Sequence, residues 1–337
     1  MKNVLLLSTG GTIASIPCKD GLAPGLSAKD IIDFVPELKD LCCIDCKTIF
    51  NLDSSNIQPE EWKVLARAVF ENLNRYDGIV ISHGTDTMAY TASILSFMLV
   101  NLNKPVIITG SQLPIIEPGT DAKDNLLHAF KTVVSDIHGV FIVFGGKVIR
   151  GVRSVKVRTT SFNAFESINA TSTGYIEDGK VFIDHSQVKS VSGPAALDDR
   201  LDSDVFLLKL IPGTHLEFFD RFSQMGYKGL VIEGFGLGGV HYLRRNLIEK
   251  LNQLMADGIA VVLTTQCLYE ISDLTVYEVG RKAAEGGIIP GYDMTSEAAV
   301  TKLMWVLGHT RDLAAVKRMM LTDYCGEIKV PLKLGVG

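Results

Sequence analysis

Short apolar segments alternate with amphipathic helical segments along the first half of the chain. The strand-like segments are 4–7, 48–52, 78–82, 104–109 and 140–144. Helical patterns connect them at 27–34, 58–76, 87–101 and 122–134. Parallel strands need long crossover connections, which helices usually supply. This order therefore predicts an α/β fold in which a parallel sheet is flanked by helices.

A polar stretch interrupts this alternation near residue 186. Beyond it, strand-like segments return at 205–210, 230–232 and 259–264, with helical segments at 216–225 and 247–256. A chain of 337 residues is long enough for two cores of ordinary size. We predict a larger N-terminal domain at 1–185, a linker at 186–204 and a smaller C-terminal α/β domain at 205–337.

The charge and hydropathy of the chain narrow its partners. There are 33 Lys and Arg against 38 Asp and Glu, a net charge of −5 without a basic stripe, so nucleic acid is not an expected partner. No segment approaches the roughly 20 apolar residues of a membrane helix. The apolar run at 4–7 is also shorter than the roughly 7–15 residues of a secretory signal core. We expect a cytoplasmic protein that acts on a small molecule and does not bind membranes.

Six cysteines include Cys43 and Cys46, which have the C-x-x-C spacing of some redox and zinc sites. A zinc site would need a second pair of ligands, and none follows at a matching spacing. Reduced thiols are the expectation for a cytosolic protein. We therefore predict no metal site.

Polar loops follow several predicted strands, at the sheet edge where open α/β folds bind ligands. The first loop carries Gly10, Gly11 and Thr12. Paired glycines allow a ligand to approach the backbone closely, although the same residues also suit a tight turn. The second loop, at 51–56, offers four polar side chains. These can bind the charged groups of an amino acid or form an Asx or Ser turn ahead of a helix.

Two further loops hold titratable groups. After the strand at 78–82, the segment His83-Gly84-Thr85-Asp86-Thr87 either caps the next helix through Thr85 or Asp86, or supplies catalytic groups near a positively polarised helix N-terminus. A general-base role and a packed structural role are equally compatible with His83. The basic run at 150–160 is typical of a solvated surface, whereas a desolvated lysine within it can act as a base.

The segment 234–239 fits the G-x-G-x-x-G pattern of dinucleotide-binding proteins. That pattern also requires an acidic residue about 20 positions later, at the end of the next strand. The corresponding residues are Thr264-Thr265-Gln266-Cys267, and none of them is acidic. A nicotinamide cofactor is therefore not expected.

Together these motifs resemble the bacterial-type L-asparaginase family, and most of all its cytoplasmic type I branch. Thr9-Gly10-Gly11-Thr12-Ile13 and His83-Gly84-Thr85-Asp86-Thr87 are similar to the two signatures of the family. The segment Asp53-Ser54-Ser55 resembles its substrate-binding loop, and Lys156 lies at the position of its catalytic lysine. Further matches are at 109–112, 264–266 and 293–298.

The resemblance implies an amidohydrolase that converts L-asparagine to L-aspartate and ammonia, without a metal or an organic cofactor. Thr12 would be the nucleophile that forms an acyl-enzyme. Thr85, Asp86 and Lys156 would form a second triad that deprotonates the nucleophile or water, because a threonine hydroxyl needs a nearby base.

The resemblance also implies how the substrate binds and how protomers associate. Asp86 would bind the α-ammonium group of the substrate. Asp53, Ser54 and Ser55 would form the substrate-binding loop, in which the two serines hold the α-carboxylate. Because active sites of this family lie near an interface between protomers, a homodimer or a dimer of dimers is implied.

One departure from the family concerns a tyrosine. The family often carries a tyrosine in the mobile loop after the first threonine, whereas this chain has Leu22 in that stretch. We take Tyr277, in the predicted C-terminal domain, as the candidate that supplies the missing hydroxyl. Gly21 and Gly25 leave the segment 15–30 able to close as a lid.

A second departure concerns regulation. Some type I enzymes bind asparagine at a separate site through an arginine, and the matching position here is Glu233, while Val155 stands where a threonine is expected. A carboxylate repels the carboxylate of such an effector. We therefore predict hyperbolic initial-rate kinetics with asparagine, and a clearly sigmoidal curve would contradict this prediction.

Two other functions remain open from the sequence. A glutaminase that supplies ammonia to a tRNA amidotransferase shares both signature loops, although that class usually carries an additional N-terminal domain. A non-catalytic protein that binds amino acids or nucleotides is the more distant alternative, and the segment 234–239 is its main support.

Overall fold

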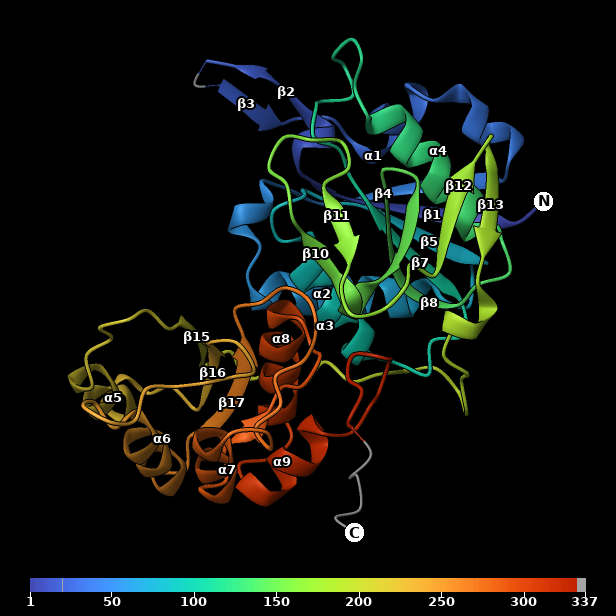
Figure 1. Cartoon of the computed structure of the whole chain (residues 1–337). Helices are drawn as coiled ribbons and strands as arrows, with labels where there is room; N and C mark the ends of the chain where they lie inside the picture. Colours follow the sequence, from blue (N-terminus) through green and yellow to red (C-terminus); the bar gives the residue numbers. More distant parts are fainter. Residues whose placement is uncertain (20, 332–337) are drawn as a thin grey trace. The chain divides into compact units, whose positions relative to one another are not determined.

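An eight-stranded sheet organises the N-terminal part of the chain (Figure 1). The computed structural model describes residues 1–19 and 21–331 and divides into two units, Met1–Asp199 and Arg200–Gly337. In the first unit, five strands run parallel in the spatial order β4 (Cys43–Leu52), β1 (Asn3–Gly10), β5 (Gly78–Ser82), β7 (Pro105–Thr109) and β8 (Gly139–Phe144). The predicted α/β fold with a mostly parallel sheet is confirmed.

Helices follow the strands as the alternation predicts. They are α1 (Ala28–Asp33), α2 (Pro59–Asn72), α3 (Met88–Met98) and α4 (Ala122–Val133). Val4 and Leu6 of β1 join a core cluster with buried residues of α1 and α4. Leu5 and Leu7, which point to the opposite side of the same strand, are also buried. Both faces of the sheet are therefore covered, as a parallel sheet requires.

Several element boundaries differ from the sequence prediction. The helix predicted at 87–101 ends at Met98, because Leu99–Val100 form strand β6, which pairs with β14 (Ala196–Leu197). Strand β14 thus lies within the stretch predicted as a linker. The strand predicted to begin at residue 48 begins at Cys43, and its mixed polar composition suits its place at the edge of the sheet.

Three antiparallel strands extend the other edge of the sheet and were missed by the sequence analysis. They are β9 (Lys147–Arg150), β12 (Gly174–Glu177) and β13 (Lys180–Ile183). Gly145 and Gly146 join β8 to β9, and Asp178 and Gly179 join β12 to β13, all four with positive φ. Two-residue turns of this kind favour Gly-Gly and Asp-Gly, so the signal was present in the sequence.

A four-stranded parallel sheet organises the second unit. Its order is β15 (Val205–Lys209), β16 (Gly229–Gly234), β17 (Ala260–Thr265) and β18 (Ile289–Pro290). The helices are α5 (Glu217–Phe222), α6 (Leu247–Ala256), α7 (Glu278–Glu285), α8 (Ser296–Leu307) and α9 (Leu313–Met320). The sequence analysis had not located β18 or the last three helices. Nowhere in 1–19 or 21–331 is a helix long and apolar enough to cross a membrane.

An ion pair lies inside the second unit, with both side chains fully buried. Lys302 on α8 places Nζ 2.6 Å from Glu327 Oε1. The ammonium group also donates to the carbonyls of Met320 and Thr322. The Glu327 carboxylate accepts the backbone N–H of Tyr324 and of Cys325. This network fixes the segment that follows α9 against α8.

Candidate active site

The loops that carry most of the predicted site residues meet at one edge of the first sheet. Strand β1 lies between β4 and β5, and β7 is the next strand beyond β5. The strands end in register, with Ser8 of β1 opposite Ser82 of β5, and Ser82 opposite Thr109 of β7. Because the strands are parallel, the loops after them emerge at the same edge.

Glycines bring these loops into direct backbone contact. A Cβ atom at Gly11 would lie 2.3 Å from the Gly84 backbone nitrogen, and one at Gly10 would lie 2.5 Å from the Leu52 backbone. Gly10 and Gly11 have φ of +98° and +75°, which disfavour residues with a side chain. A Cβ at Gly84 would meet the Ser54 side chain at 2.6 Å. The glycines therefore form a tight turn and also allow the neighbouring loops to approach one another closely.

Lys156 links the segment after η4 (Gly151–Arg153) to the loop that follows β5. Its Nζ donates to Thr85 Oγ1 at 2.8 Å and to Asp86 Oδ1 at 2.6 Å. The Lys156 side chain is 16% exposed and that of Asp86 is 59% exposed. Strand β10 (Ser154–Lys156) pairs with β11 (Phe165–Ser167), and both η4 and β10 pack on α3.

The basic run is not a solvated surface over most of its length. Arg153 is only 1% exposed, and Gly151, Val152, Ser154 and Val155 are buried as well. Only Arg158 and the residues after it are exposed. The surface interpretation is therefore wrong for the stretch that positions Lys156.

Ser54 connects the second loop, at 51–56, to the third loop, at 83–87, which follows β5. Its Oγ accepts the Asp86 backbone N–H at 3.3 Å, and its carbonyl accepts the Thr87 hydroxyl at 2.8 Å. Ser54 is 3% exposed, whereas Asp53 and Ser55 are exposed. Asp53 Oδ1 accepts the Ser55 N–H at 2.8 Å and caps the short helix η3 (Ser54–Asn56), which is the Asx turn considered above.

Thr87 occupies the N-cap position of α3, without a capping hydrogen bond from its side chain. Capping by Thr85 or Asp86 was therefore a wrong alternative, and the side chains of both contact Lys156 instead. Thr12 is half-buried and begins the short helix η1 (Thr12–Ala14), directly after Gly11. The Gly11–Gly84 contact therefore carries Thr12 into the neighbourhood of Thr85.

His83 is held in a buried hydrogen-bond chain behind the third loop. Its Nδ1 lies 2.7 Å from the Gly84 carbonyl, and its Nε2 lies 3.0 Å from Thr91 Oγ1. A carbonyl only accepts, so Nδ1 carries the hydrogen and Nε2 accepts the Thr91 hydroxyl. Trp62 Nε1 donates to the same hydroxyl oxygen at 3.1 Å. Burial lowers the pKa of His83 to about 4, although the Gly84 carbonyl opposes this effect. The packed interpretation of His83 fits this environment.

Sequence and structure comparisons agree with this geometry. Residues 3–189 match the family Asparaginase, N-terminal, and residues 204–320 match the Glutaminase/Asparaginase C-terminal domain. An L-asparaginase from Thermococcus kodakarensis is 45% identical over 326 residues, which cover 96% of this chain and 98% of that protein. The chain belongs to the asparaginase family. It is an amidohydrolase of that family.

Other members show how far the similarity extends. The thermostable T. kodakarensis L-asparaginase structure has a TM-score of 0.93 at 44% identity, covering 98% of this chain and all of that one. L-asparaginase I from Vibrio cholerae has a TM-score of 0.87 at 30% identity, covering 98% and 99%. A component of the glutamyl-tRNA(Gln) amidotransferase from Pyrococcus furiosus is 42% identical over 340 residues, which cover 97% of this chain and 77% of that protein.

Two predicted residues of this asparaginase-family chain belong to its second unit. Tyr277 precedes α7 and is 61% exposed; its catalytic role stays a prediction. Glu233 lies in β16 and accepts the Ser296 hydroxyl at 2.6 Å, and Lys209 Nζ is 3.9 Å from its carboxylate. The glycine-rich segment after β16 closes on itself through a bridge between Phe235 and Gly239, and α6 begins only at Leu247.

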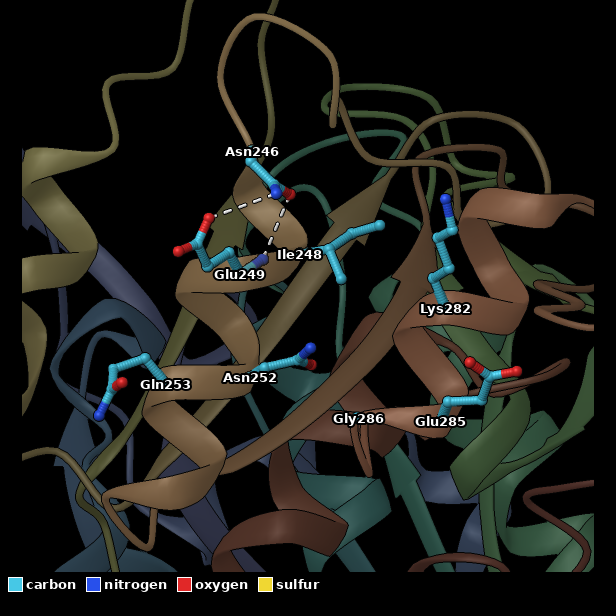
Figure 2. Close-up of a pocket in the computed structure, with 8 residues that line it drawn as sticks. All are labelled: Asn246, Ile248, Glu249, Asn252, Gln253, Lys282, Glu285 and Gly286. Carbon is cyan, nitrogen blue, oxygen red and sulfur yellow. Dashed lines mark hydrogen bonds between the residues drawn. The ribbon is translucent and has the colours of Figure 1, made fainter.

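A cavity of about 660 Å³ lies between α6 and α7 in the second unit (Figure 2). It is lined by Asn246, Ile248, Glu249, Asn252, Gln253, Lys282, Glu285 and Gly286. Asn246 caps α6 by accepting the Glu249 N–H at 3.3 Å, and Lys282 pairs with Glu278 at 2.7 Å. None of the predicted site residues lines this cavity. Within the described part of the chain, no group of three His, Cys, Asp or Glu residues is placed to hold a metal ion.

Sequence reasoning gave no individual role to Gln112 or Asp121. Gln112 Oε1 lies 3.3 Å from Thr85 Oγ1, and the buried Asp121 carboxylate accepts the Gln112 backbone N–H at 3.0 Å. Gln112 follows β7, the strand next to β5. The rule that loops after parallel strands form the site was therefore the signal that could have found it.

Proposed function

We propose that this chain hydrolyses L-asparagine to L-aspartate and ammonia through a threonine nucleophile. The observation that carries the proposal is the contact of Lys156 Nζ with both Thr85 Oγ1 and Asp86 Oδ1, at the sheet edge where Gly11 packs against Gly84. A hydroxyl, an amine and a carboxylate are thus gathered beside the backbone that carries Thr12. The reaction needs no metal and no organic cofactor.

In the proposed reaction, Thr12 Oγ1 attacks the side-chain amide carbon of asparagine. The nucleophile's proton passes through the Thr85 hydroxyl to Lys156 in its neutral form, and the C–N bond breaks as the leaving nitrogen takes up a proton to leave as ammonia. Water then attacks the aspartyl ester, and its proton follows the same route. Such general acid–base assistance contributes about 10²–10⁴-fold to the rate.

The same loops supply charges for the substrate's α-groups. Asp86 is the proposed partner of the α-ammonium group, and its exposed carboxylate leaves room for it. Ser54 accepts the Asp86 N–H, which leaves its own hydroxyl hydrogen for the α-carboxylate. Ser55 and Asp53 complete the substrate-binding loop. Tyr277 is the proposed source of the hydroxyl that the loop around Leu22 lacks.

The alternative substrate is glutamine, with the ammonia delivered to a partner that amidates tRNA-bound glutamate. It is favoured by the 42% identity to the P. furiosus amidotransferase component. Asparagine is favoured because the T. kodakarensis L-asparaginase matches along 98% of its own length. We further propose that the chain is cytoplasmic and forms a homodimer or a dimer of dimers. The cytoplasmic location is supported by a solved relative from Campylobacter jejuni, 28% identical with a TM-score of 0.84, which is a probable cytoplasmic L-asparaginase.

Ammonia release from asparagine and from glutamine tests this proposal. We expect turnover of asparagine by the wild type and its loss by at least about 10²-fold in Thr12→Ala and Thr85→Ala. Thr12→Ser, which keeps a hydroxyl at the same position, serves as the matched control and should retain more activity than Thr12→Ala. Unchanged turnover in both alanine variants would contradict the mechanism. Faster ammonia release from glutamine than from asparagine would favour the ammonia-supplying role.

A further inference from the structure

Gln112 joins three loops around the proposed active site through its side chain. Its Nε2 donates to the carbonyl of Thr159 at 3.0 Å and to that of Ser161 at 3.1 Å. Both acceptors lie in the loop that follows Lys156. Its Oε1 lies 3.3 Å from Thr85 Oγ1. Gln112 itself belongs to the loop after β7.

These contacts determine which way the Gln112 amide points. A primary amide has two N–H donors, and here both are directed at carbonyl oxygens, which can only accept. The amide oxygen must then face Thr85. Because this oxygen is itself only an acceptor, the hydroxyl hydrogen of Thr85 points toward Gln112. Lys156 Nζ donates to the same hydroxyl oxygen, so one lone pair of that oxygen remains for a further donor.

The backbone of Gln112 is fixed as firmly as its side chain. The Asp121 carboxylate, 6% exposed, accepts the N–H of Gln112 at 3.0 Å and of Leu113 at 3.1 Å. Asn125 donates to the same carboxylate and to the Gly110 carbonyl, each at 3.0 Å. Buried carboxylates that accept several backbone N–H groups hold a loop in one conformation.

We propose that Gln112 is a positioning residue, which accepts the Thr85 hydroxyl hydrogen while Lys156 carries the proton taken from the nucleophile or water. The inference rests on the proposed roles of Thr85 and Lys156. In the transfer, the Thr85 hydroxyl turns from Gln112 to the Lys156 amine and gives it its hydrogen, while the reacting hydroxyl gives its proton to Thr85. Thr85 therefore keeps one hydrogen throughout, and the hydrogen that it ends with points to Gln112. Gln112 gains no proton. It supplies the acceptor that this hydrogen needs once Lys156 has become an ammonium ion and can no longer accept.

Two substitutions separate this role from simple anchoring of the loop. Gln112→Met keeps the length of the side chain and removes both donor and acceptor. Gln112→Glu keeps an acceptor for Thr85 and loses the donors to Thr159 and Ser161. If accepting the Thr85 hydrogen is what matters, Gln112→Glu retains more kcat than Gln112→Met. If anchoring is what matters, the carboxylate faces two carbonyls and Gln112→Glu is the slower variant.

The measurement is kcat and KM for asparagine, at a temperature where circular dichroism shows each variant folded. We expect kcat of Gln112→Met to fall about tenfold, the loss typical of one neutral hydrogen bond. KM should change less than about threefold, because the groups proposed to bind the substrate are untouched. Gln253→Met, on α6 in the second unit, serves as the matched control and should leave both constants unchanged.

The inference is overturned if Gln112→Met keeps wild-type kcat, if kcat is unchanged while KM rises, or if Gln112→Glu is no faster than Gln112→Met. These outcomes differ from a failure of the proposed function itself. That failure would appear as full activity in Thr12→Ala and Thr85→Ala, whatever the Gln112 variants do.

Discussion

Replacing Lys156 with methionine is expected to lower kcat for asparagine by about 10²–10⁴-fold, the usual contribution of a positioned acid–base group. Lys156 is the amine that contacts Thr85 Oγ1, and its side chain is largely shielded from water. Without it, the proton of the nucleophile has no base to reach through Thr85. KM should change far less than kcat, since Asp86 and Ser54 keep their backbone positions. Steady-state ammonia release measures both constants.

Lys156→Arg distinguishes proton transfer from the effect of a positive charge. Arginine keeps the charge beside Asp86 but is not deprotonated in proteins, so it cannot accept the proton. We therefore expect Lys156→Arg to be nearly as slow as Lys156→Met. Lys131→Met, on α4, removes a lysine that donates to the exposed Gly179 carbonyl, and this variant should behave as the wild type. A fast arginine variant would mean that Lys156 acts by charge alone.

Substituting Glu327 with glutamine is expected to lower the free energy of unfolding by about 3–5 kcal/mol, because it leaves the Lys302 ammonium buried without a counter-charge. Both side chains are 0% exposed, so water cannot replace the lost partner. Lys302→Met should be destabilising in the same range, and the double variant should lose less than the sum of the two. Urea unfolding followed by circular dichroism gives the three values.

The exposed pair of Lys282 and Glu278 provides the control. Their side chains are 52% and 65% exposed, so Glu278→Gln should leave the unfolding curve unchanged. Equal effects at both sites would contradict the importance of burial. Burial opposes ionisation of Glu327, but Lys302 and two backbone N–H groups outweigh it and hold its pKa below the ordinary 4.5. The stability from this pair is therefore complete above pH 4.5 and is lost as the pH falls further.

The parts of the fold that repeat a local pattern could be predicted from the sequence. The inner strands β5, β7 and β8 are apolar runs of five or six residues. The crossovers are helices, and α1 and α2 begin with capping signals at Ser27 and Gln58. The order of strands and helices also predicted that the polar loops after the parallel strands lie together at one edge of the sheet. The antiparallel extension was missed because its strands are short, although the Gly145-Gly146 and Asp178-Gly179 turns marked them.

Contacts between residues distant in the sequence could not be predicted in this way. Burial of Arg153 depends on α3, and the pairing of Lys302 with Glu327 depends on the chain returning after α9. A charged residue is normally exposed, so residue type alone predicts an exposed side chain at Arg153, Lys302 and Glu327, and all three are buried. The resemblance to a known family was enough to single out Lys156. The contacts of Lys156 and of Gln112 with Thr85 could be found only from the three-dimensional arrangement.

The backbone contact between Gly11 and Gly84 sets limits on how this chain can be re-engineered. A library that aims at a new amide substrate gains nothing from these two positions, because a Cβ atom at Gly11 would collide with the Gly84 backbone and one at Gly84 would collide with the Ser54 side chain. Asp53 and Ser55, whose side chains are exposed, can vary without that penalty. Substitutions that alter specificity should therefore be sought in the second loop, while Gly11 and Gly84, which join the first and third loops, should be kept as glycines.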